Sequence, residues 1–291
     1  MKKRTLISLL TAITTGASAI IVFDQDPNPN IYPPPEFGQW PTVKWQLCQG
    51  TPIDPFHFIT AKHVGGLIGG SAISHDAATI WKTVSVTYHP TADLAIWGVD
   101  IPFAEWFDVY RGADELGQTA WMFGRGAQKG VPLYGPDGGL DGWKWGKWDG
   151  ATRWGLNTID DLDQHWLWTD FDPEPGQCIL MGGDSGGPLF IRDDDQWLLA
   201  GVNVAVDGGY SLDPGLPADL HAILFDPENW YLDGEPAPGP SRSWSYRLSN
   251  YADWIDSVVG TSPSIPEPIQ TTAYMIAMML FVARKCLRKL K

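Results

Sequence analysis

The stretch Gly183-Asp184-Ser185-Gly186-Gly187-Pro188 carries the strongest signal for fold and chemistry in this chain. Glycines on both sides of a serine let the backbone turn tightly, so that successive N–H groups can face one small space. Such N–H groups can hold the oxyanion that forms when a serine attacks a carbonyl carbon. The same residues could also form an ordinary polar turn. A nucleophilic Ser185 therefore requires a base and an acid elsewhere in the chain.

His63 is the expected base, because it directly follows the strand-like run 58–62, in which bulky apolar and small residues alternate. Asp93 is the expected acid, since it opens the apolar run 94–97 and would be buried there against an imidazole. The alternative is purely structural: His63 would lie at the edge of a core, Asp93 would cap a strand and Ser185 would occupy a turn. The other histidines of the chain are His57, His75, His89, His165 and His221.

These segments resemble the motifs of chymotrypsin-like serine peptidases. Thr60-Ala61-Lys62-His63 is similar to the family's Thr-Ala-Ala-His, and Asp93-Leu94-Ala95-Ile96 is similar to its Asp-Ile-Ala-Leu. The order His63, Asp93, Ser185 is also the family's order and differs from that of subtilisin and the α/β-hydrolases. The resemblance implies a catalytic triad of these three residues, with the N–H groups of Gly183 and Ser185 as the oxyanion hole. It further implies a serine endopeptidase that acts on a peptide or protein substrate and needs no cofactor or metal.

Short apolar runs separated by Gly, Pro, Asp and Asn predict an all-β protein, and long amphipathic helices are missing from the pattern. The resemblance implies two packed six-stranded antiparallel β-barrels, at about 42–112 and 116–247, with the active site in the crevice between them. Residues 248–259 predict a short C-terminal helix that closes the domain 42–259. The Pro- and Asp-rich residues 20–41 are expected to form an extended arm.

The expected substrate pocket has no acidic residue. In the family, residues shortly before the nucleophile form the base of this pocket, and here the stretch 178–182 is apolar. Ile179 is therefore expected at the base, with Val204 and Val206 on the wall. A trypsin-like preference for Arg or Lys is not supported, and a small or medium apolar residue is favoured.

Both ends of the chain resemble targeting signals. Residues 1–19 combine three basic residues, an apolar run and Ala17-Ser18-Ala19, which predicts a signal peptide; a transmembrane anchor is the alternative. Cleavage after Ala19 would free Ile20, and in the chymotrypsin-like family a freed Ile ammonium inserts beside the acid before the nucleophile, here Asp184. The glycines that usually follow are replaced by Phe23 and Asp24.

The linker 260–268 contains Pro266-Glu267-Pro268 and precedes a tail, 269–291, with an apolar run and a basic end. This arrangement resembles the PEP-CTERM sorting signal of Gram-negative bacteria, which an exosortase reads. The resemblance implies export to the bacterial cell envelope or extracellular matrix, with at least transient anchoring in the membrane through the tail. An amphipathic tail helix is the alternative.

The chain has 20 Lys and Arg against 34 Asp and Glu, for a formal net charge of −14. Eight of the basic residues lie in the two terminal segments, so the body is more acidic still, which argues against nucleic-acid binding. Of the three cysteines, Cys286 lies in the tail, and the sequence leaves open whether Cys48 and Cys178 form a disulfide.

Two other features leave alternatives open. The tryptophans in 138–168 could line a sugar-binding platform, but period-2 spacing favours packing in strands. The acidic runs at 160–163 and 193–195 could bind Ca²⁺, but solvated turns are favoured because no known ligand loop is present. For the whole protein, a non-catalytic binding module on the same fold and an esterase with the same triad remain rivals to the peptidase.

Overall fold

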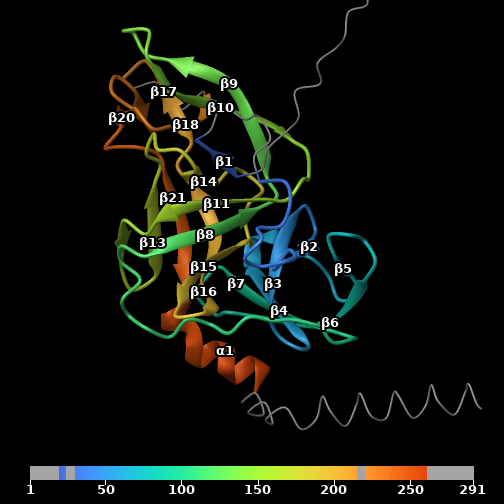
Figure 1. Cartoon of the computed structure of the whole chain (residues 1–291). Coiled ribbons are helices and arrows are strands. Elements are labelled where there is room, and N and C mark those ends of the chain that lie inside the picture. Colours follow the sequence, from blue (N-terminus) through green and yellow to red (C-terminus); the bar gives the residue numbers. More distant parts are fainter. Residues whose placement is uncertain (1–19, 24–29, 215–219, 261–291) are drawn as a thin grey trace, which may run out of the picture.

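The computed structural model describes residues 20–23, 30–214 and 220–260. It confirms the predicted all-β architecture of two packed halves, closed by a short C-terminal helix (Figure 1). The predicted signal peptide and sorting tail, and all of the predicted linker except Gly260, lie outside the described residues. Within the described ranges, no helix is both long enough and apolar enough to cross a membrane.

The first half is a closed antiparallel barrel in the order β2-β3-β4-β7-β6-β5. Large aromatic side chains fill it, among them Trp45, Phe58 and Trp97, because alternate strand residues face the interior. Its strands are β2 (Val43–Trp45), β3 (Cys48–Asp54), β4 (His57–Ala61), β5 (Ser71–Ile73), β6 (Ile80–Tyr88) and β7 (Leu94–Val99).

The second half is a seven-stranded antiparallel sheet that forms a half-barrel in the order β11-β8-β15-β16-β21-β13-β12. Its strands are β8 (Thr119–Gly124), β11 (Arg153–Thr158), β12 (Asp161–Leu162), β13 (Trp166–Asp170), β15 (Pro188–Asp193), β16 (Gln196–Val206) and β21 (Arg242–Arg247). It fills the place of the expected second barrel. Ile59 and Leu94 of the barrel share one apolar cluster with Phe123, Phe190 and Leu199 of the half-barrel, so the two halves are joined by a common core.

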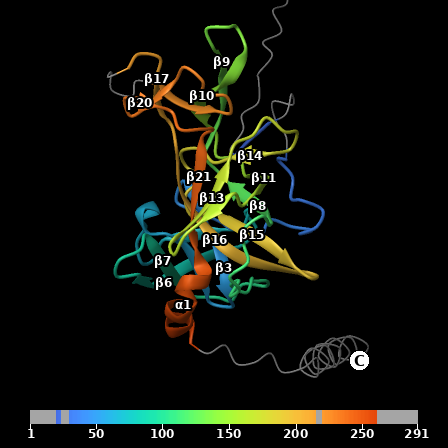
Figure 2. The same cartoon turned by 90° about the vertical axis from the view of Figure 1, so that its left-hand side faces the viewer.

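A third sheet, which the sequence did not predict, lies at the end of the molecule opposite the helix (Figure 2). We call it the accessory sheet; its order is β20-β19-β17-β18-β10-β9. Two separate segments supply it, because β10 pairs with β18 across a long stretch of chain. Its strands are β9 (Ala127–Tyr134), β10 (Leu140–Trp148), β17 (Gly209–Ser211), β18 (Leu220–Leu224), β19 (Tyr231–Leu232) and β20 (Glu235–Pro236).

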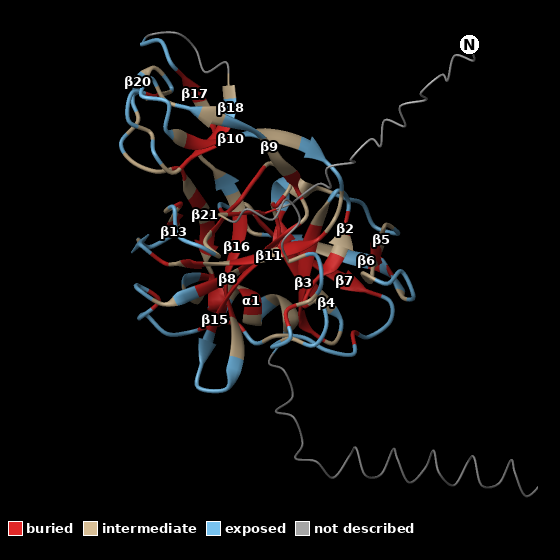
Figure 3. Cartoon of the chain, turned by 45° about the horizontal axis from the view of Figure 1, so that its top comes forward, coloured by how far each residue is buried: buried red, intermediate tan, exposed pale blue. Residues whose placement is uncertain are grey.

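Two short strands, β1 (Ile21–Val22) and β14 (Cys178–Ile179), pair with each other and hold the N-terminal segment against the half-barrel. Residues 21–22 of the predicted arm are therefore part of a sheet. In the rest of the arm, Phe37 stacks on Trp197 with ring centroids 4.6 Å apart. Buried residues are concentrated in the strands of the barrel and half-barrel, as Figure 3 shows.

The C-terminal helix α1 (Ala252–Val259) follows the 3-10 turn η2 (Leu248–Tyr251) and packs onto the common core through Ile255. Arg111 and Asp256 form a bidentate ion pair at its exposed side, at 2.7 and 3.0 Å. The segment that connects the two halves of the molecule is held by a second, buried ion pair. Buried Glu115 accepts hydrogen bonds from Arg247 at 2.7 and 2.8 Å and from Ser249 at 2.8 Å.

Candidate active site

The structure brings His63, Asp93 and Ser185 together, although 122 positions separate the histidine from the serine. The Nδ1 atom of His63 lies 2.5 Å from Oδ2 of Asp93, and its Nε2 atom lies 2.7 Å from Oγ of Ser185. Both distances lie within hydrogen-bond reach. This order of contacts, serine to imidazole to carboxylate, is the one that a serine nucleophile, its base and the group that orients the base require.

Strand pairing in the first barrel fixes the histidine beside the aspartate. Neighbouring strands β4 and β7 pair Ala61 with Leu94, so the residues next to this pair leave the sheet together. His63 lies in the 3-10 turn η1 (Lys62–Val64) directly after β4, and Asp93 directly precedes β7. Asp93 also accepts the backbone N–H of His63 at 2.7 Å, which fixes the carboxylate relative to the turn.

Ser185 approaches from the half-barrel, on the loop between β14 and β15. This loop is held by reciprocal backbone hydrogen bonds with β16: Gly186 donates to the carbonyl of Asn203, and Asn203 donates to that of Gly187, both at 2.8 Å. Gly186 has φ +77°, and a Cβ there would collide with Oγ1 of Thr60 in the barrel. Glycine is therefore required at this position, because the loop lies in close contact with the other half of the molecule.

The carboxylate of Asp93 controls the charge of His63. The hydrogen bond from Asp93 raises the pKa of His63 above its ordinary value, against the opposing effect of burial. The sequence predicted a buried Asp93, but its side chain is 33% exposed, and that of His63 is 46% exposed. The pair therefore lies at the rim of the crevice, and Tyr246, whose hydroxyl accepts the N–H of Asp93 at 3.0 Å, supports it from the half-barrel.

The predicted oxyanion donors are free to bind a ligand. Gly183 adopts φ +98°, a conformation that favours glycine. Among the described residues, the N–H groups of Gly183 and Ser185 have no acceptor, whereas those of Asp184, Gly186 and Gly187 donate to backbone carbonyls at 2.8–3.1 Å. Two unpaired N–H groups beside a serine hydroxyl can stabilise a negative charge that develops there.

Asp184, the residue before Ser185, is buried and contacts the N-terminal segment. Its carboxylate accepts N–H groups from Gly126 at 2.6 Å and Met181 at 2.7 Å, and also from Ile20 and Arg125. Burial raises the pKa of Asp184 to about 7 despite these hydrogen bonds. Ile20 itself is fully buried. The proximity of Ile20 to Asp184 that the resemblance implied is thus present, here with the peptide nitrogen of Ile20 as the donor.

A cavity of about 190 Å³ opens beside Ser185. Val204 and Val206 line it, as do Leu180 and Met181 from the stretch before the nucleophile. Ile179, which the sequence placed at the base of the pocket, is not among its lining residues. It is fully buried in another cluster, because β14 pairs with β1 and sets Ile179 opposite Ile21.

The cavity also contains Trp145, which the sequence analysis did not assign to a site. Its spacing from Trp143 indicated only that the two indoles belong to a strand. Nothing local in the sequence shows that β10 pairs with β18, which brings this tryptophan to the pocket. The other tryptophans of 138–168 make packing contacts, such as Trp154 stacked on Trp121 at 5.1 Å.

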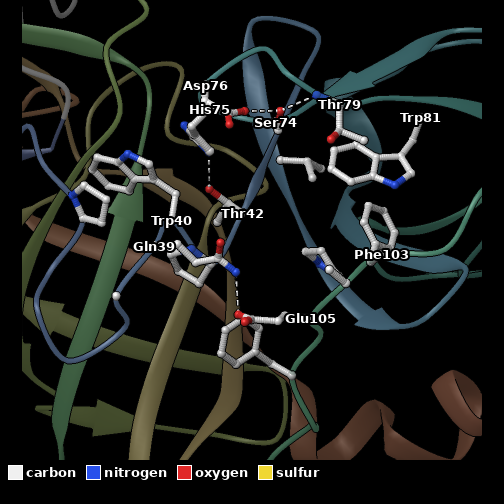
Figure 4. Close-up of a pocket in the computed structure, with 17 residues that line it drawn as sticks. Gln39, Trp40, Thr42, Ser74, His75, Asp76, Thr79, Trp81, Phe103 and Glu105 are labelled. Carbon is white, nitrogen blue, oxygen red and sulfur yellow. Dashed lines mark hydrogen bonds between the residues drawn. The ribbon is translucent and has the colours of Figure 1, made fainter. Parts of the chain in front are cut away.

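A second and larger cavity, of about 390 Å³, lies apart from the triad (Figure 4). Aromatic residues such as Trp81 and Phe103 form part of its lining, and none of the triad residues does. Several of its polar side chains are already paired with one another. Gln39 donates to Glu105 at 2.5 Å and Ser74 donates to Asp76 at 2.6 Å. These contacts stabilise the wall of the cavity and leave fewer groups to bind a ligand.

His75, at the edge of the same cavity, links the two halves of the molecule. Its ring nitrogens lie 2.9 Å from Oγ1 of Thr42 and 3.0 Å from Oγ1 of Thr152. Burial, with further contributions from Lys44 and Arg125, lowers the pKa of His75 to about 3. A histidine that stays neutral and is hydrogen-bonded on both sides has a structural role here.

The remaining sequence candidates have structural roles as well. Cys48 and Cys178 are both free thiols. Asp163 accepts the N–H groups of His165 and Trp166 at 2.6 and 2.8 Å, and Asp194 has φ +49° in the turn between β15 and β16. The predicted solvated turn is present at Asp194 and Asp195, whereas Asp161 lies in β12 and Asp193 ends β15. In the described part of the chain, no group of three or more His, Cys, Asp or Glu side chains is arranged to hold a metal ion.

No protein-family model matches this chain, and no curated protein matches its sequence. The contacts among His63, Asp93 and Ser185 and the two packed halves that carry them are the features that point to a function.

Proposed function

We propose that this protein is a serine endopeptidase in which Ser185 is the nucleophile, His63 the general base and Asp93 the group that orients the base. One observation carries the proposal: a single imidazole lies 2.5 Å from a carboxylate through Nδ1 and 2.7 Å from a serine hydroxyl through Nε2. A histidine bound on both sides in this way has its tautomer fixed, with Nε2 free to accept the serine proton.

The first half of the reaction forms an acyl-enzyme. Oγ of Ser185 attacks the carbonyl carbon of the peptide bond while Nε2 of His63 takes the hydroxyl proton. The negative charge on the carbonyl oxygen is held by the N–H groups of Gly183 and Ser185. His63 then gives its proton to the amide nitrogen, the C–N bond breaks and the amine product leaves.

The second half releases the acid product. A water molecule attacks the ester carbonyl, and His63 takes a proton from it. The tetrahedral intermediate collapses, the C–O bond to Ser185 breaks, and His63 returns the proton to Oγ. Asp93 stabilises the imidazolium in both steps of the reaction, which agrees with the raised pKa of His63.

Labelling with a fluorophosphonate probe tests whether Ser185 is a nucleophile. We expect wild-type protein to be labelled at Ser185, Ser185→Ala to be unlabelled, and Ser257→Ala, a change at a helix serine, to be labelled like wild type. Equal labelling of wild type and Ser185→Ala, or none in either, would falsify the proposal and favour a non-catalytic binding protein.

Peptide turnover separates a peptidase from an esterase with the same triad. The peptidase is expected to cleave members of a random peptide library at internal bonds, and Ser185→Ala is expected to cleave none. Hydrolysis of simple esters without cleavage of any peptide would establish the esterase instead. We favour the peptidase because the cavity of about 190 Å³ beside Ser185 could hold the side chain of a peptide residue next to the cleaved bond.

We also propose that the protein is exported to the bacterial cell envelope or matrix, with an exosortase-type enzyme acting on its tail. The support is the sequence of the two terminal segments alone. Expression in a Gram-negative host, followed by fractionation and mass spectrometry of both ends, tests this. Cytoplasmic protein with intact residues 1–19 would contradict it.

A further inference from the structure

Trp145 reaches the cavity beside Ser185 from outside the barrel and half-barrel. It belongs to β10 of the accessory sheet, whereas most of the cavity is formed by the nucleophile loop and β16. Its indole lies between two glycines. The ring packs so closely on both that neither could carry a side chain. A Cβ atom built at Gly182 would lie 2.8 Å from the ring, and one built at Gly208 would lie 2.6 Å from it. The ring thus fills the space between the segments before Ser185 and after Val206.

The accessory sheet holds this indole in place. Nε1 of Trp145 donates to the backbone carbonyl of Ala222 at 3.2 Å. The ring also stacks on His221, with centroids 5.1 Å apart and an interplanar angle of 27°. Both partners belong to β18, which pairs with β10 through Lys144 and Ala222. An aromatic ring fixed by a hydrogen bond and by stacking cannot easily swing aside for a larger substrate group.

The size and polarity of the cavity limit what can enter. Its volume is about 190 Å³, below the roughly 300–1,000 Å³ of pockets that take whole small molecules. The lining side chains of Trp145, Leu180, Met181, Val204 and Val206 are apolar. Asp184 also borders the cavity but is only 1% exposed, and its carboxylate is engaged by backbone N–H groups.

We propose that Trp145 is the specificity-determining residue of this site. It limits the size of the substrate residue on the acyl side of the cleaved bond, so that small and medium aliphatic side chains are preferred over aromatic ones. This inference rests on the proposed function, since it assumes that a peptide is cleaved at Ser185. It goes beyond that function because it assigns the limit on substrate size to the accessory sheet.

Two peptide substrates that differ only at the acyl-side residue, valine in one and phenylalanine in the other, test the proposal. For wild-type protein, kcat/KM is expected to favour valine. In Trp145→Ala the cavity is enlarged, and the ratio of the two kcat/KM values is expected to move toward phenylalanine by about 10- to 200-fold, the range for small changes in an apolar pocket. Trp145→Phe is expected to give an intermediate ratio.

Trp148→Ala is the matched control, because Trp148 lies on the same strand, is exposed and does not line the cavity. Its ratio is expected to equal that of wild type. Trp145→Phe keeps an aromatic ring in the sheet and serves as the test if Trp145→Ala does not fold. A ratio unchanged in the folded Trp145 variants would overturn the proposal.

Failure of the proposed function would look different. Peptidyl phosphonates with valine or phenylalanine next to the phosphorus report on the cavity without turnover. Label on Ser185 with no preference between the two probes, in wild type and variants alike, contradicts the role of Trp145 only. Absence of label and of cleavage in every protein would overturn the peptidase and, with it, the proposal for Trp145.

Discussion

Asp93 determines both the orientation and the charge of His63. It holds the turn η1 through the backbone N–H and the ring through Nδ1, at 2.7 and 2.5 Å. Since this hydrogen bond raises the pKa of His63, the protonated imidazole is favoured at the rim of the crevice. In the proposed mechanism, a rise in pKa of this kind means that His63 becomes neutral, and so able to accept the serine proton, only at higher pH.

The substitution Asp93→Asn tests this dependence. We expect kcat/KM to fall by about 10⁴-fold, since the neutral amide favours the wrong tautomer of His63. In wild type, activity should rise with pH as His63 loses its proton, with a midpoint above the ordinary value for histidine. The midpoint should be lower in Asp93→Asn. A pH–rate profile of both proteins measures this, and equal midpoints would show that Asp93 does not control the charge of His63.

The contact between His63, Asp93 and Ser185 could be predicted from the sequence because each of them lies in a short motif whose local structure is sufficient to place it. Thr60 to His63 end one strand and begin a turn, Asp93 opens the neighbouring strand, and glycines surround Ser185. The prediction that Ile179 forms the base of the pocket was wrong for the opposite reason. Its position is set by pairing with Ile21, more than 150 positions away, which no local pattern records.

Strand β1 brings Ile20 to Asp184, and the charge state of this contact should affect stability. In a chain that extends beyond Ile20 on its N-terminal side, the hydrogen-bond donors to Asp184 are neutral backbone N–H groups, and burial raises its pKa to about 7. The folded state then binds a proton that the unfolded state releases near pH 4. The contribution of Asp184 to stability is therefore fully present below pH 4 and is lost as the pH rises toward 7.

Urea unfolding of two chains, one beginning at Ala19 and one at Ile20, measures this effect. The chain from Ala19 should lose up to about 4 kcal/mol between pH 4 and pH 7. The chain from Ile20 should not show this loss, because its free ammonium stabilises the charged carboxylate. Asp184→Asn should remove the difference between the two chains. Identical pH profiles would show that the ammonium does not reach Asp184.

The buried ion pair between Glu115 and Arg247 fastens the segment that connects the two halves of the molecule to the end of β21. Burial alone would raise the pKa of Glu115, but hydrogen bonds from Arg247 and Ser249 outweigh this and lower it. Removing one partner would leave a buried charge without its counter-ion. Glu115→Ala should therefore cost about 3–5 kcal/mol of unfolding free energy.

Arg111→Ala provides the control for Glu115→Ala, since the exposed pair with Asp256 should contribute only about 0–1 kcal/mol. Chemical denaturation of both variants at pH 7 makes the comparison. Losses of equal size would mean that burial does not distinguish the two ion pairs.

The accessory sheet marks the limit of what the sequence could predict at the level of strands. β17, β19 and β20 have only two or three residues, too few for a visible period-2 pattern. β9 and β10 pair with three register irregularities, which break the alternation. In place of the expected six-stranded second barrel, the structure therefore has a seven-stranded half-barrel and, beside it, the accessory sheet.

The molecule as a whole is stabilised without disulfides among its described residues. Cys48 and Cys178 are free, and burial raises the pKa of Cys48 to about 11, which keeps its thiol protonated and unreactive. Stability comes instead from apolar clusters rich in aromatic residues and from the core shared by the two halves.

Reductant should accordingly have no effect on thermal stability. We expect the melting temperature of the purified protein to stay within about 1 °C when dithiothreitol is added, because no covalent loop is opened. Differential scanning calorimetry with and without reductant measures this. A fall of several degrees would indicate a disulfide between Cys48 and Cys178.

The pairing of β10 with β18 has a consequence for the order in which the molecule folds. It joins Trp145 to Ala222 across 77 positions, whereas the first barrel closes within residues 43–99. Long-range contacts carry a larger loop-closure entropy and tend to form late. We expect the barrel with His63 and Asp93 to form early and the wall at Trp145 to form last. For the peptidase proposed above, intermediates on this pathway would lack a complete substrate pocket and so would cleave neighbouring chains poorly during folding.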